Sequence, residues 1–218
     1  MIHLGDITKI HGDEIEPVDC IVGGSPCQDV SCAGKRAGIQ HSALGSEETT
    51  RSGLFMEQVR IIREMRERDI KNGRTDIFIR PRYAIWENVP GAFSSAGNGI
   101  KGADFAAVLT EFVRCIEPEA PDIDVPAKGW TNEGVLQDEL GNWSIAWAVH
   151  DLQYWGTTSF PTPQRRRRIS VVCDFGGPGA RALLSLPESM YLQRWNNPCA
   201  CCVDGYGRWL CTYDCGER

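Results

Sequence analysis

Residues 19–28 read Asp-Cys-Ile-Val-Gly-Gly-Ser-Pro-Cys-Gln, and this stretch decides the fold that we predict. Its short apolar run ends in two glycines, which is typical of a buried strand that passes into a loop. The loop that follows, residues 25–38, is rich in glycine, serine and cysteine. A second strand is expected at residues 83–86, and Glu87 and Asn88 open the loop that it feeds.

Two amphipathic helices are predicted from the spacing of apolar residues. The first covers residues 54–68, and the second covers residues 104–116 and is ended by Pro118 and Pro121. The segment from there to Asn142 is rich in proline, glycine and acidic residues, so we expect it to lie outside the core.

Two more segments favour β-structure. Residues 143–155 mix aromatic and β-forming residues, and residues 169–173 form an apolar run behind four arginines. The alternation of strands and helices predicts an α/β fold with a partial parallel sheet flanked by helices. Ligands of such sheets bind at the carboxyl ends of the strands, so the loops after residues 24 and 86 are expected to face one crevice.

The composition is that of an ordinary globular protein. The chain has 218 residues, 42% of them hydrophobic and 24% charged, and a formal net charge of -6. A net negative charge does not favour nucleic acid binding, whereas the local run Arg165 to Arg168 does. No signal peptide and no membrane span are evident, so we expect a cytoplasmic protein whose ten cysteines are mostly reduced.

Cys27 is the first candidate for chemistry. A cysteine acts as a nucleophile when it is partly exposed and nearby positive charge favours its thiolate. Pro26 stiffens the turn before Cys27 through its restricted φ, and Lys35 and Arg36 lie on the same loop. The alternative is a packed cysteine that acts as a small hydrophobic residue.

Three further candidates each have a structural alternative. Glu87 could be a general acid, or a capping or solvated carboxylate. Arg166 and Arg168 share one face of an extended chain and could bind an anion bidentately, or form a solvated basic edge. Asp6 could accept a hydrogen bond from an amino group of a ligand, or cap a turn.

Together and in this order, the four motifs resemble those of the bacterial and phage DNA cytosine-C5 methyltransferases. Residues 24–28 with 31–38 look like the catalytic loop of that family, and residues 87–89 look like its Glu-Asn-Val motif. Gln164-x-Arg166-x-Arg168 resembles its Gln-x-Arg-x-Arg motif, and residues 5–7 are similar to the segment whose Asp approaches the cofactor adenine. The resemblance covers roughly residues 3–175.

The resemblance implies a Rossmann-like, S-adenosylmethionine-dependent methyltransferase fold and DNA (cytosine-5-)-methyltransferase activity. Members of the family, some of which serve restriction-modification, move a methyl group to C5 of a cytosine flipped out of double-stranded DNA. Cys27 would form the covalent adduct, and Glu87 would protonate N3 of the ring. Arg166 and Arg168 would stabilise the charge that develops there.

The resemblance also implies binding residues. The residues expected to bind S-adenosylmethionine are Asp6, Ile7, Pro26 and Asn88. The residues expected to contact DNA are Ser31, Lys35, Arg36 and Gln164. No metal is expected at this site.

The chain departs from the family at both ends. The family's Phe-x-Gly-x-Gly cofactor loop would precede Gly5, and a target-recognition region would follow the arginine strand. We therefore expect residues 1–175 to form a partial catalytic domain, with a separate chain as a possible source of the missing loop. Residues 176–218 would be a cysteine-rich tail, either a remnant of the target-recognition region or a replacement for it.

Two other functions stay open from the sequence. One is a catalytically incomplete remnant that only binds DNA. The other is a zinc-binding module in the tail, whose candidate ligands are Cys199, Cys201, Cys202, Cys211 and Cys215.

Overall fold

The computed structural model describes residues 2–25, 53–95, 99–151 and 165–184. The chain divides into two compact units. The first consists of residues 1–149 and 169–184, and the second of residues 150–168 and 185–218. Within the described ranges, no helix is long and apolar enough to cross a membrane.

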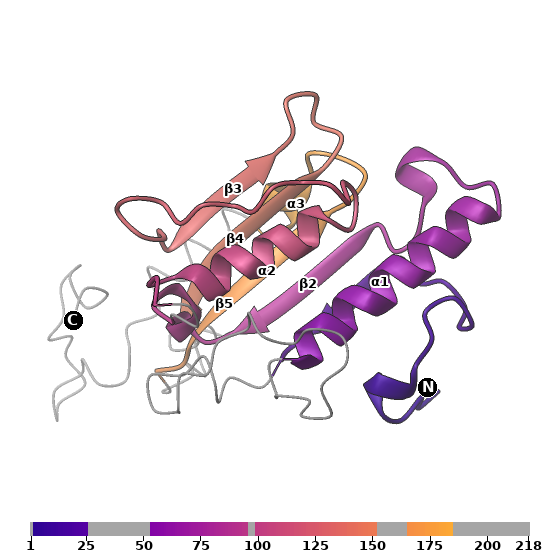
Figure 1. Ribbon diagram of the computed structural model, residues 1–218, viewed down its shortest axis with the longest axis horizontal. Helices are drawn as coiled ribbons and strands as arrows, with labels where there is room; N and C mark the ends of the chain where they lie inside the picture. Colours follow the sequence, from indigo (N-terminus) through magenta and orange to yellow (C-terminus); the bar gives the residue numbers. More distant parts are fainter. Residues whose placement is uncertain (1, 26–52, 96–98, 152–164, 185–218) are drawn as a thin grey trace, which may run out of the picture. The chain divides into compact units, whose positions relative to one another are not determined.

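The first unit is built around five strands and three α-helices (Figure 1). In chain order these are β1 (Cys20–Gly23), α1 (Gly53–Lys71), β2 (Tyr83–Asn88), α2 (Ala103–Val113), β3 (Glu133–Gln137), β4 (Ser144–Asp151), β5 (Arg167–Asp174) and α3 (Ala180–Leu184). The last two residues of β4 and the first two of β5 belong to the second unit. Short 3-10 helices occur at η1 (Ile7–Lys9), η2 (Asp76–Phe78) and η3 (Pro90–Phe93).

The strands form one mixed sheet in the order β1-β2-β5-β4-β3. β1 and β2 are parallel, as the strand–helix–strand pattern predicts, because α1 carries the chain back between them. β5 is antiparallel to β2, and β3 is antiparallel to β4. A tight turn explains the second of these pairings, since the Gly141 N–H donates to the Asp138 carbonyl oxygen at 3.2 Å between β3 and β4.

The larger part of the core lies between the sheet and helices α1 and α2. Alternate residues of each strand point to this layer, as in β2, where Ala84 and Trp86 do so. Ile85 lies between them in sequence and packs on the other side of the sheet, in a smaller cluster with Ala180 of α3. Figure 1 shows α1 and α2 on the same side of the sheet. The fold is thus α/β, with helices on both faces of the sheet.

Both predicted helices are confirmed, although the second ends at Val113, before Pro118. Two expectations are wrong. The segment after Pro118 contains β3. In the same segment, Trp130 packs against Phe105 with ring centroids 5.0 Å apart, because burial of its large ring outweighs the polar character of the residues around it. The run 20–22 is not buried either, because β1 is the outermost strand of the sheet on its side.

Candidate functional site

The carboxyl ends of β1 and β2 lie side by side, as the sequence predicts. Gly23 pairs with Trp86, so the residue after β1 runs alongside the last residues of β2. Ser25 receives hydrogen bonds from two side chains of β2. Trp86 Nε1 donates to Ser25 Oγ at 3.1 Å, and Asn88 Nδ2 donates to the same oxygen at 3.1 Å. The start of the Ser-Pro-Cys loop is therefore attached to the end of β2.

Asn88 holds both loops at once. Besides Ser25 Oγ, its Nδ2 faces the Ser25 carbonyl oxygen at 3.3 Å, and its Oδ1 accepts from the Val89 N–H at 2.8 Å. Its side chain is buried, with 2% of the residue exposed. The amide is thus engaged within the protein on both its donor and its acceptor side, which suits a positioning residue.

Glu87 lies next to the other residue of this junction. A Cβ built on Gly24 would lie 3.3 Å from Glu87 Oε2 and 3.6 Å from the Glu87 carbonyl oxygen. Glycine at position 24 therefore lets the carboxylate approach the backbone just before the Ser-Pro-Cys turn. Glu87 is half-buried and, by the pleat of β2, points to the opposite side of the sheet from Asn88.

Helix α1 secures the junction from the core side. Gln58 of α1 donates from Nε2 to the Ile85 carbonyl oxygen at 3.1 Å. The Gln58 side-chain amide also covers Gly23, where a Cβ would overlap it. Gln58 is buried, so this contact replaces hydration that its amide has lost. The helix thus fixes the spacing of β1 and β2 where they end.

Of the two predicted arginines, Arg166 directly precedes β5 and Arg168 is the second residue of that strand. The Arg166 N–H donates to Asp151 Oδ1 at 3.0 Å, which joins the end of β4 to the segment before β5. Arg168 is half-buried, and its Nη1 donates to the Arg167 carbonyl oxygen at 2.8 Å. Arg166 is exposed. Arg166 therefore lies just before β5, and Arg168 lies in the part of β5 that precedes its buried residues.

Asp6 caps η1. Its Oδ1 accepts from the Thr8 N–H at 3.0 Å and from the Thr8 hydroxyl at 2.9 Å. These two hydrogen bonds, the backbone one first, lower the pKa of the exposed Asp6 carboxyl. The neighbouring Ile7 carbonyl oxygen accepts from Arg60 of α1 at 3.3 Å. The capping role that the sequence allowed is thus present, and the carboxylate remains accessible.

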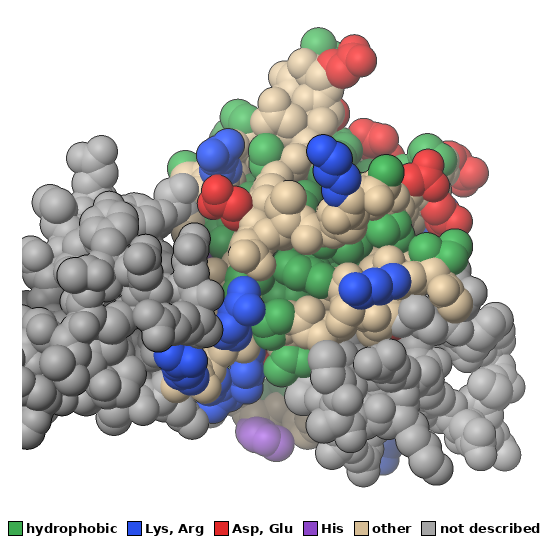
Figure 2. All heavy atoms as spheres, turned by 90° about the vertical axis from the view of Figure 1, so that its left-hand side faces the viewer, with side chains coloured by type: hydrophobic (Ala, Val, Ile, Leu, Met, Phe, Trp, Pro, Cys, Tyr) green, Lys and Arg blue, Asp and Glu red, His purple; other side chains and the backbone are tan. Residues whose placement is uncertain are grey.

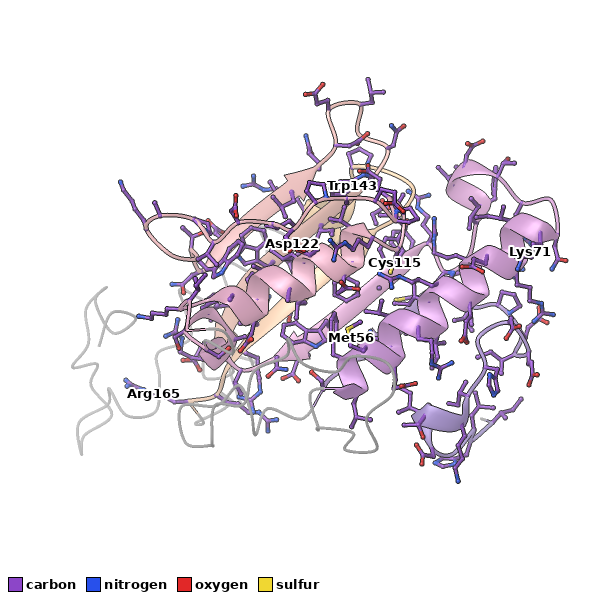
Figure 3. All side chains as sticks on the ribbon, in the orientation of Figure 1. Met56, Lys71, Cys115, Asp122, Trp143 and Arg165 are labelled. Atoms are coloured by element: carbon purple, nitrogen blue, oxygen red, sulfur yellow. The ribbon has the colours of Figure 1, made fainter. Side chains whose placement is uncertain are left out.

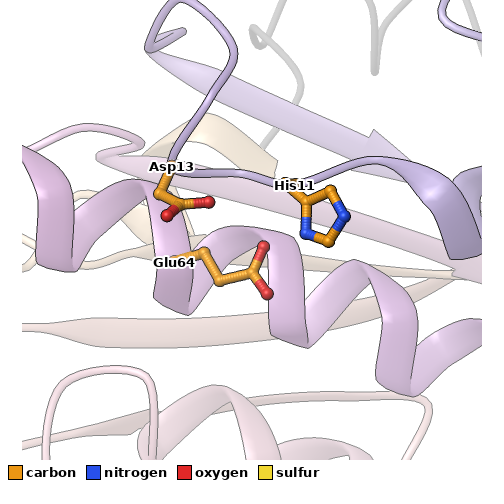
Figure 4. A group of neighbouring side chains, drawn as sticks. All are labelled: His11, Asp13 and Glu64. Atoms are coloured by element: carbon orange, nitrogen blue, oxygen red, sulfur yellow. The ribbon is translucent and has the colours of Figure 1, made fainter.

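One group of side chains has the composition of a metal site. The ligand atoms of His11, Asp13 and Glu64 lie within 4.8 Å of one another (Figure 4). Both oxygens of Glu64 already accept hydrogen bonds from Arg60, at 2.8 and 2.9 Å, and Oε2 also accepts from the Gly12 N–H at 2.7 Å. A guanidinium thus already neutralises this carboxylate, and the group serves to attach the N-terminal segment to α1.

Several predicted residues lie outside the described part of the chain. They are Pro26, Cys27, Ser31, Lys35, Arg36, Gln164 and the five cysteines of the tail. Sequence reasoning did not single out Ser25, Trp86 or Gln58. The sequence contains a hint for two of them, since Ser25 directly precedes the Pro-Cys pair and Trp86 directly precedes the Glu-Asn pair.

Comparison with known proteins supports the family resemblance. A family model described as C-5 cytosine-specific DNA methylase matches residues 1–115. Type II methyltransferase M1.ScrFI of Lactococcus lactis subsp. cremoris is 42% identical over 76 residues, which are 33% of this chain and 18% of that protein. Type II methyltransferase M.MspI of Moraxella sp is 33% identical over 102 residues, 46% of this chain and 19% of that protein.

A longer match has a different name. A DNA N-6-adenine-methyltransferase of Escherichia phage P1 is 30% identical over 187 residues, which are 79% of this chain and 22% of that protein. The chain spans about a fifth of the length of these three relatives.

Proposed function

Because the chain belongs to the C-5 cytosine-specific DNA methylase family, we propose that it acts in methyl transfer to C5 of cytosine in double-stranded DNA. Cys27 is the nucleophile and Glu87 the acid. The observation that carries the proposal is the junction at Ser25 and Gly24, where the start of the Cys27 loop is bound by Asn88 and approached by Glu87. We place the protein in the cytoplasm, because the double-stranded DNA of a bacterial cell lies there.

The chemistry accounts for the choice of residues. C5 of cytosine is too weak a nucleophile to take a methyl group unaided. The Cys27 thiolate adds to C6, and the electron pair of the C5–C6 double bond moves into the ring. C5 then bonds to the methyl group as the bond from that group to the sulfonium sulfur breaks and a neutral thioether leaves. A base removes the C5 proton, and the restored double bond expels the thiolate. These atoms are reachable only when the cytosine is flipped out of the duplex.

Glu87 and the two arginines manage the charge in the ring. As the thiolate adds, negative charge develops on N3 and the exocyclic oxygen, and a proton from Glu87 at N3 relieves it. Arg168 and Arg166 supply positive charge for the same purpose. Gln164 and the loop residues Ser31, Lys35 and Arg36 contact the DNA, most of them at phosphates.

S-adenosylmethionine supplies a methyl group activated by its sulfonium. The residues available for it fit only part of such a molecule. The accessible Asp6 carboxylate can accept from its adenine amino group. Ile7 and Pro26 offer apolar contact, whereas the amide of Asn88 is engaged with Ser25 and Val89. Asn88 therefore shapes the cofactor side of the loop rather than binding the cofactor through its amide.

A separate chain would complete that site. Within the described residues, β1 pairs with β2 alone, and no described strand lies along its other edge. Val22 on this strand is 69% exposed, and Cys20 is exposed as well. An unpaired strand edge with apolar side chains accepts an added strand through main-chain hydrogen bonds. We therefore place a glycine-rich cofactor segment beside β1.

Covalent trapping tests the proposal. The full chain is incubated with S-adenosylmethionine and duplex DNA containing 5-fluorocytosine, with and without the N-terminal segment of a relative. Fluorine cannot leave as a cation, so the adduct at Cys27 persists and is detected by mass spectrometry. Cys27→Ser should abolish it, and Glu87→Gln should slow it by about 100-fold, the scale of one general acid. Failure to form an adduct under either condition contradicts the proposal.

The same reaction mixture distinguishes adenine as the target. Methyl transfer to an exocyclic amino group needs no thiol addition to the ring, so N6-methyladenine should form equally well in Cys27→Ser. Nucleoside analysis of unmodified DNA after incubation is therefore the second measurement. 5-Methylcytosine that depends on Cys27 supports the proposal, and N6-methyladenine that does not depend on it contradicts it.

A further inference from the structure

A hollow of about 630 Å³ lies beside the N-terminus of α2, formed by two separate loops. One side comprises Phe93, the last residue of η3, with Ile100 and Lys101 of the loop that follows it. The other contributes residues 125–130, including Lys128 and Trp130. Figure 2 shows the side of the molecule that carries these loops, with apolar side chains gathered in its middle and both basic and acidic side chains around them.

The two loops are fixed to one another. Trp130 Nε1 donates to the Gly102 carbonyl oxygen at 2.9 Å, and the Gly102 N–H donates to the Ser95 carbonyl oxygen at 2.8 Å. Gly102 has φ +90°, and a Cβ there would lie 2.9 Å from the Trp130 ring. The Gly129 N–H donates to the Pro126 carbonyl oxygen at 2.7 Å, which closes a turn around Lys128. These contacts join the described residues of the two loops.

The hollow is apolar inside and positive at its margin. Phe93 and Trp130 both meet the edge of the buried Phe105 ring, with centroids 4.7 and 5.0 Å away, so they are held in place. Ile100 is 57% exposed at the opening. Lys101 and Lys128, one on each loop, are both exposed.

Two of the nearby acidic groups do not face this positive charge as free carboxylates. Asp122 is paired with Arg114 at 3.0 Å, and Asp104 is fully buried. Asp124, which precedes the lining residue Val125, and Glu133, three residues after Trp130, are exposed carboxylates close in sequence to the hollow.

We propose that this hollow is a second DNA-contacting site, which takes a sugar-phosphate segment of the substrate with a phosphate at each lysine. This inference rests on the proposed function, because DNA is the ligand that it assumes. Ammonium groups from two loops, beside an apolar surface, suit the phosphates and sugars of a nucleic acid strand. The contact carries no base specificity, so it adds affinity and orientation rather than choice of sequence.

Charge removal at the two lysines tests the site. The double variant Lys101→Gln/Lys128→Gln is compared with wild type by fluorescence anisotropy on an unmodified duplex at several salt concentrations. Each lost phosphate contact lowers the salt slope by about 0.9, so the double variant should lose about 1.8 and bind about tenfold more weakly near 0.1 M salt. A scrambled duplex should show the same loss, and Lys101→Arg/Lys128→Arg should bind like wild type.

Lys71→Gln is the matched control. Lys71 is an exposed lysine in the last turn of α1, away from the N-terminus of α2, and is labelled in Figure 3. It should leave both affinity and salt slope unchanged. Wild-type binding that the double variant retains overturns the inference, as does a wild-type chain that does not bind the duplex. Preferential binding of poly-glutamate over DNA at these lysines overturns it too, because an acidic peptide would then be the ligand.

The two proposals fail separately in this design. Adduct formation at Cys27 measures the proposed function, and anisotropy measures the hollow. Normal trapping with unaltered binding in the lysine variant removes only the hollow. Lysine-dependent binding without an adduct removes only the methyl transfer.

Discussion

Asn88 Nδ2 lies 3.1 Å from Ser25 Oγ and 3.3 Å from the Ser25 carbonyl oxygen, across 63 residues of sequence. Ser25 precedes Pro26 and Cys27, whereas Asn88 directly follows Glu87. One buried amide thus ties the segment that carries the proposed nucleophile to the segment that carries the proposed acid. Its contribution to catalysis is one of position.

Asn88→Ala should slow formation of the Cys27–DNA adduct by about 10- to 100-fold. The change removes one of the two donors to Ser25 and the acceptor of the Val89 N–H, at a cost of about 1–3 kcal/mol in unfolding free energy. The rate is measured at saturating DNA and at a temperature where the variant is fully folded. Asn72→Ala, at an exposed turn, should match wild type. An unchanged rate in folded Asn88→Ala would show that the residue is only structural.

Alanine substitutions at the adjacent Gly23 and Gly24 should affect stability and activity differently. At Gly23 a methyl group would overlap the Gln58 amide, so Gly23→Ala displaces Gln58 from the Ile85 carbonyl oxygen. We expect a loss of about 1–3 kcal/mol in unfolding free energy, measured by urea denaturation.

At Gly24 the methyl group meets the Glu87 carboxylate at 3.3 Å, which can shift by a few tenths of an ångström. Gly24→Ala should therefore change the unfolding free energy by less than about 0.5 kcal/mol and slow adduct formation several-fold. The opposite pattern, with the larger stability loss in Gly24→Ala, would contradict the packing at this junction.

Because of Asp69, the unfolding free energy should decrease as the pH is lowered. Burial alone would raise the pKa of this carboxyl, but hydrogen bonds from the Arg80 side chain and backbone and the charge of Arg74 outweigh burial and lower it below its ordinary value of 3.8. A lowered pKa contributes stability above pH 3.8 that is lost as the pH falls toward the folded-state value.

Asp69→Asn should lower the unfolding free energy at pH 7 by about 1–3 kcal/mol, because charge-assisted bonds to Arg80 are lost. Denaturation curves from pH 7 to pH 2 should show a shallower acid decline in the variant. Asp122→Asn, on an exposed loop, serves as the comparison and should keep the wild-type decline.

Cysteine labelling should follow burial. Burial raises the pKa of the Cys115 thiol to about 11 and raises that of Cys173 further above its usual range. Cys20 on β1 is exposed as a residue. Partial burial of its thiol, together with the negative charge of the nearby Asp19, nevertheless raises its pKa. Iodoacetamide at pH 8.0 should therefore modify Cys20 and spare Cys115 and Cys173, as peptide mass spectrometry can show.

In denaturant all three thiols should react. Added N-terminal segment from a relative should protect Cys20 if that segment pairs with β1. Native-state modification of Cys173 would contradict its burial.

The two helices and β2 followed from the sequence because each is encoded locally. Phe55, Val59 and Ile62 repeat at helical spacing, and all three are buried. The short run 20–22 shows the limit of such reasoning. Its apolar residues predict a strand. Whether that strand is buried depends on the strands that pair beside it, and the local sequence pattern does not show these.

Local patterns also missed β3 and the role of Trp130. The proline, glycine and acidic residues around Trp130 predict an excursion, yet the ring packs between Phe105 and Trp147 with its Nε1 bonded across to Gly102. Packing of this kind joins residues that are far apart in sequence. Such packing can therefore outweigh the local composition, and the local composition does not reveal it.

The sequence by itself determined the family and the order of the four motifs, because the residues that perform a reaction must be present whatever surrounds them. Tertiary structure alone decided that Asn88 and Trp86 hold Ser25, that Gly24 admits Glu87, and that two loops form a hollow with a lysine on each. Hydrogen bonds and close approaches depend on distances between segments. Those distances are set only when the sheet pairs and α1 packs across β1 and β2.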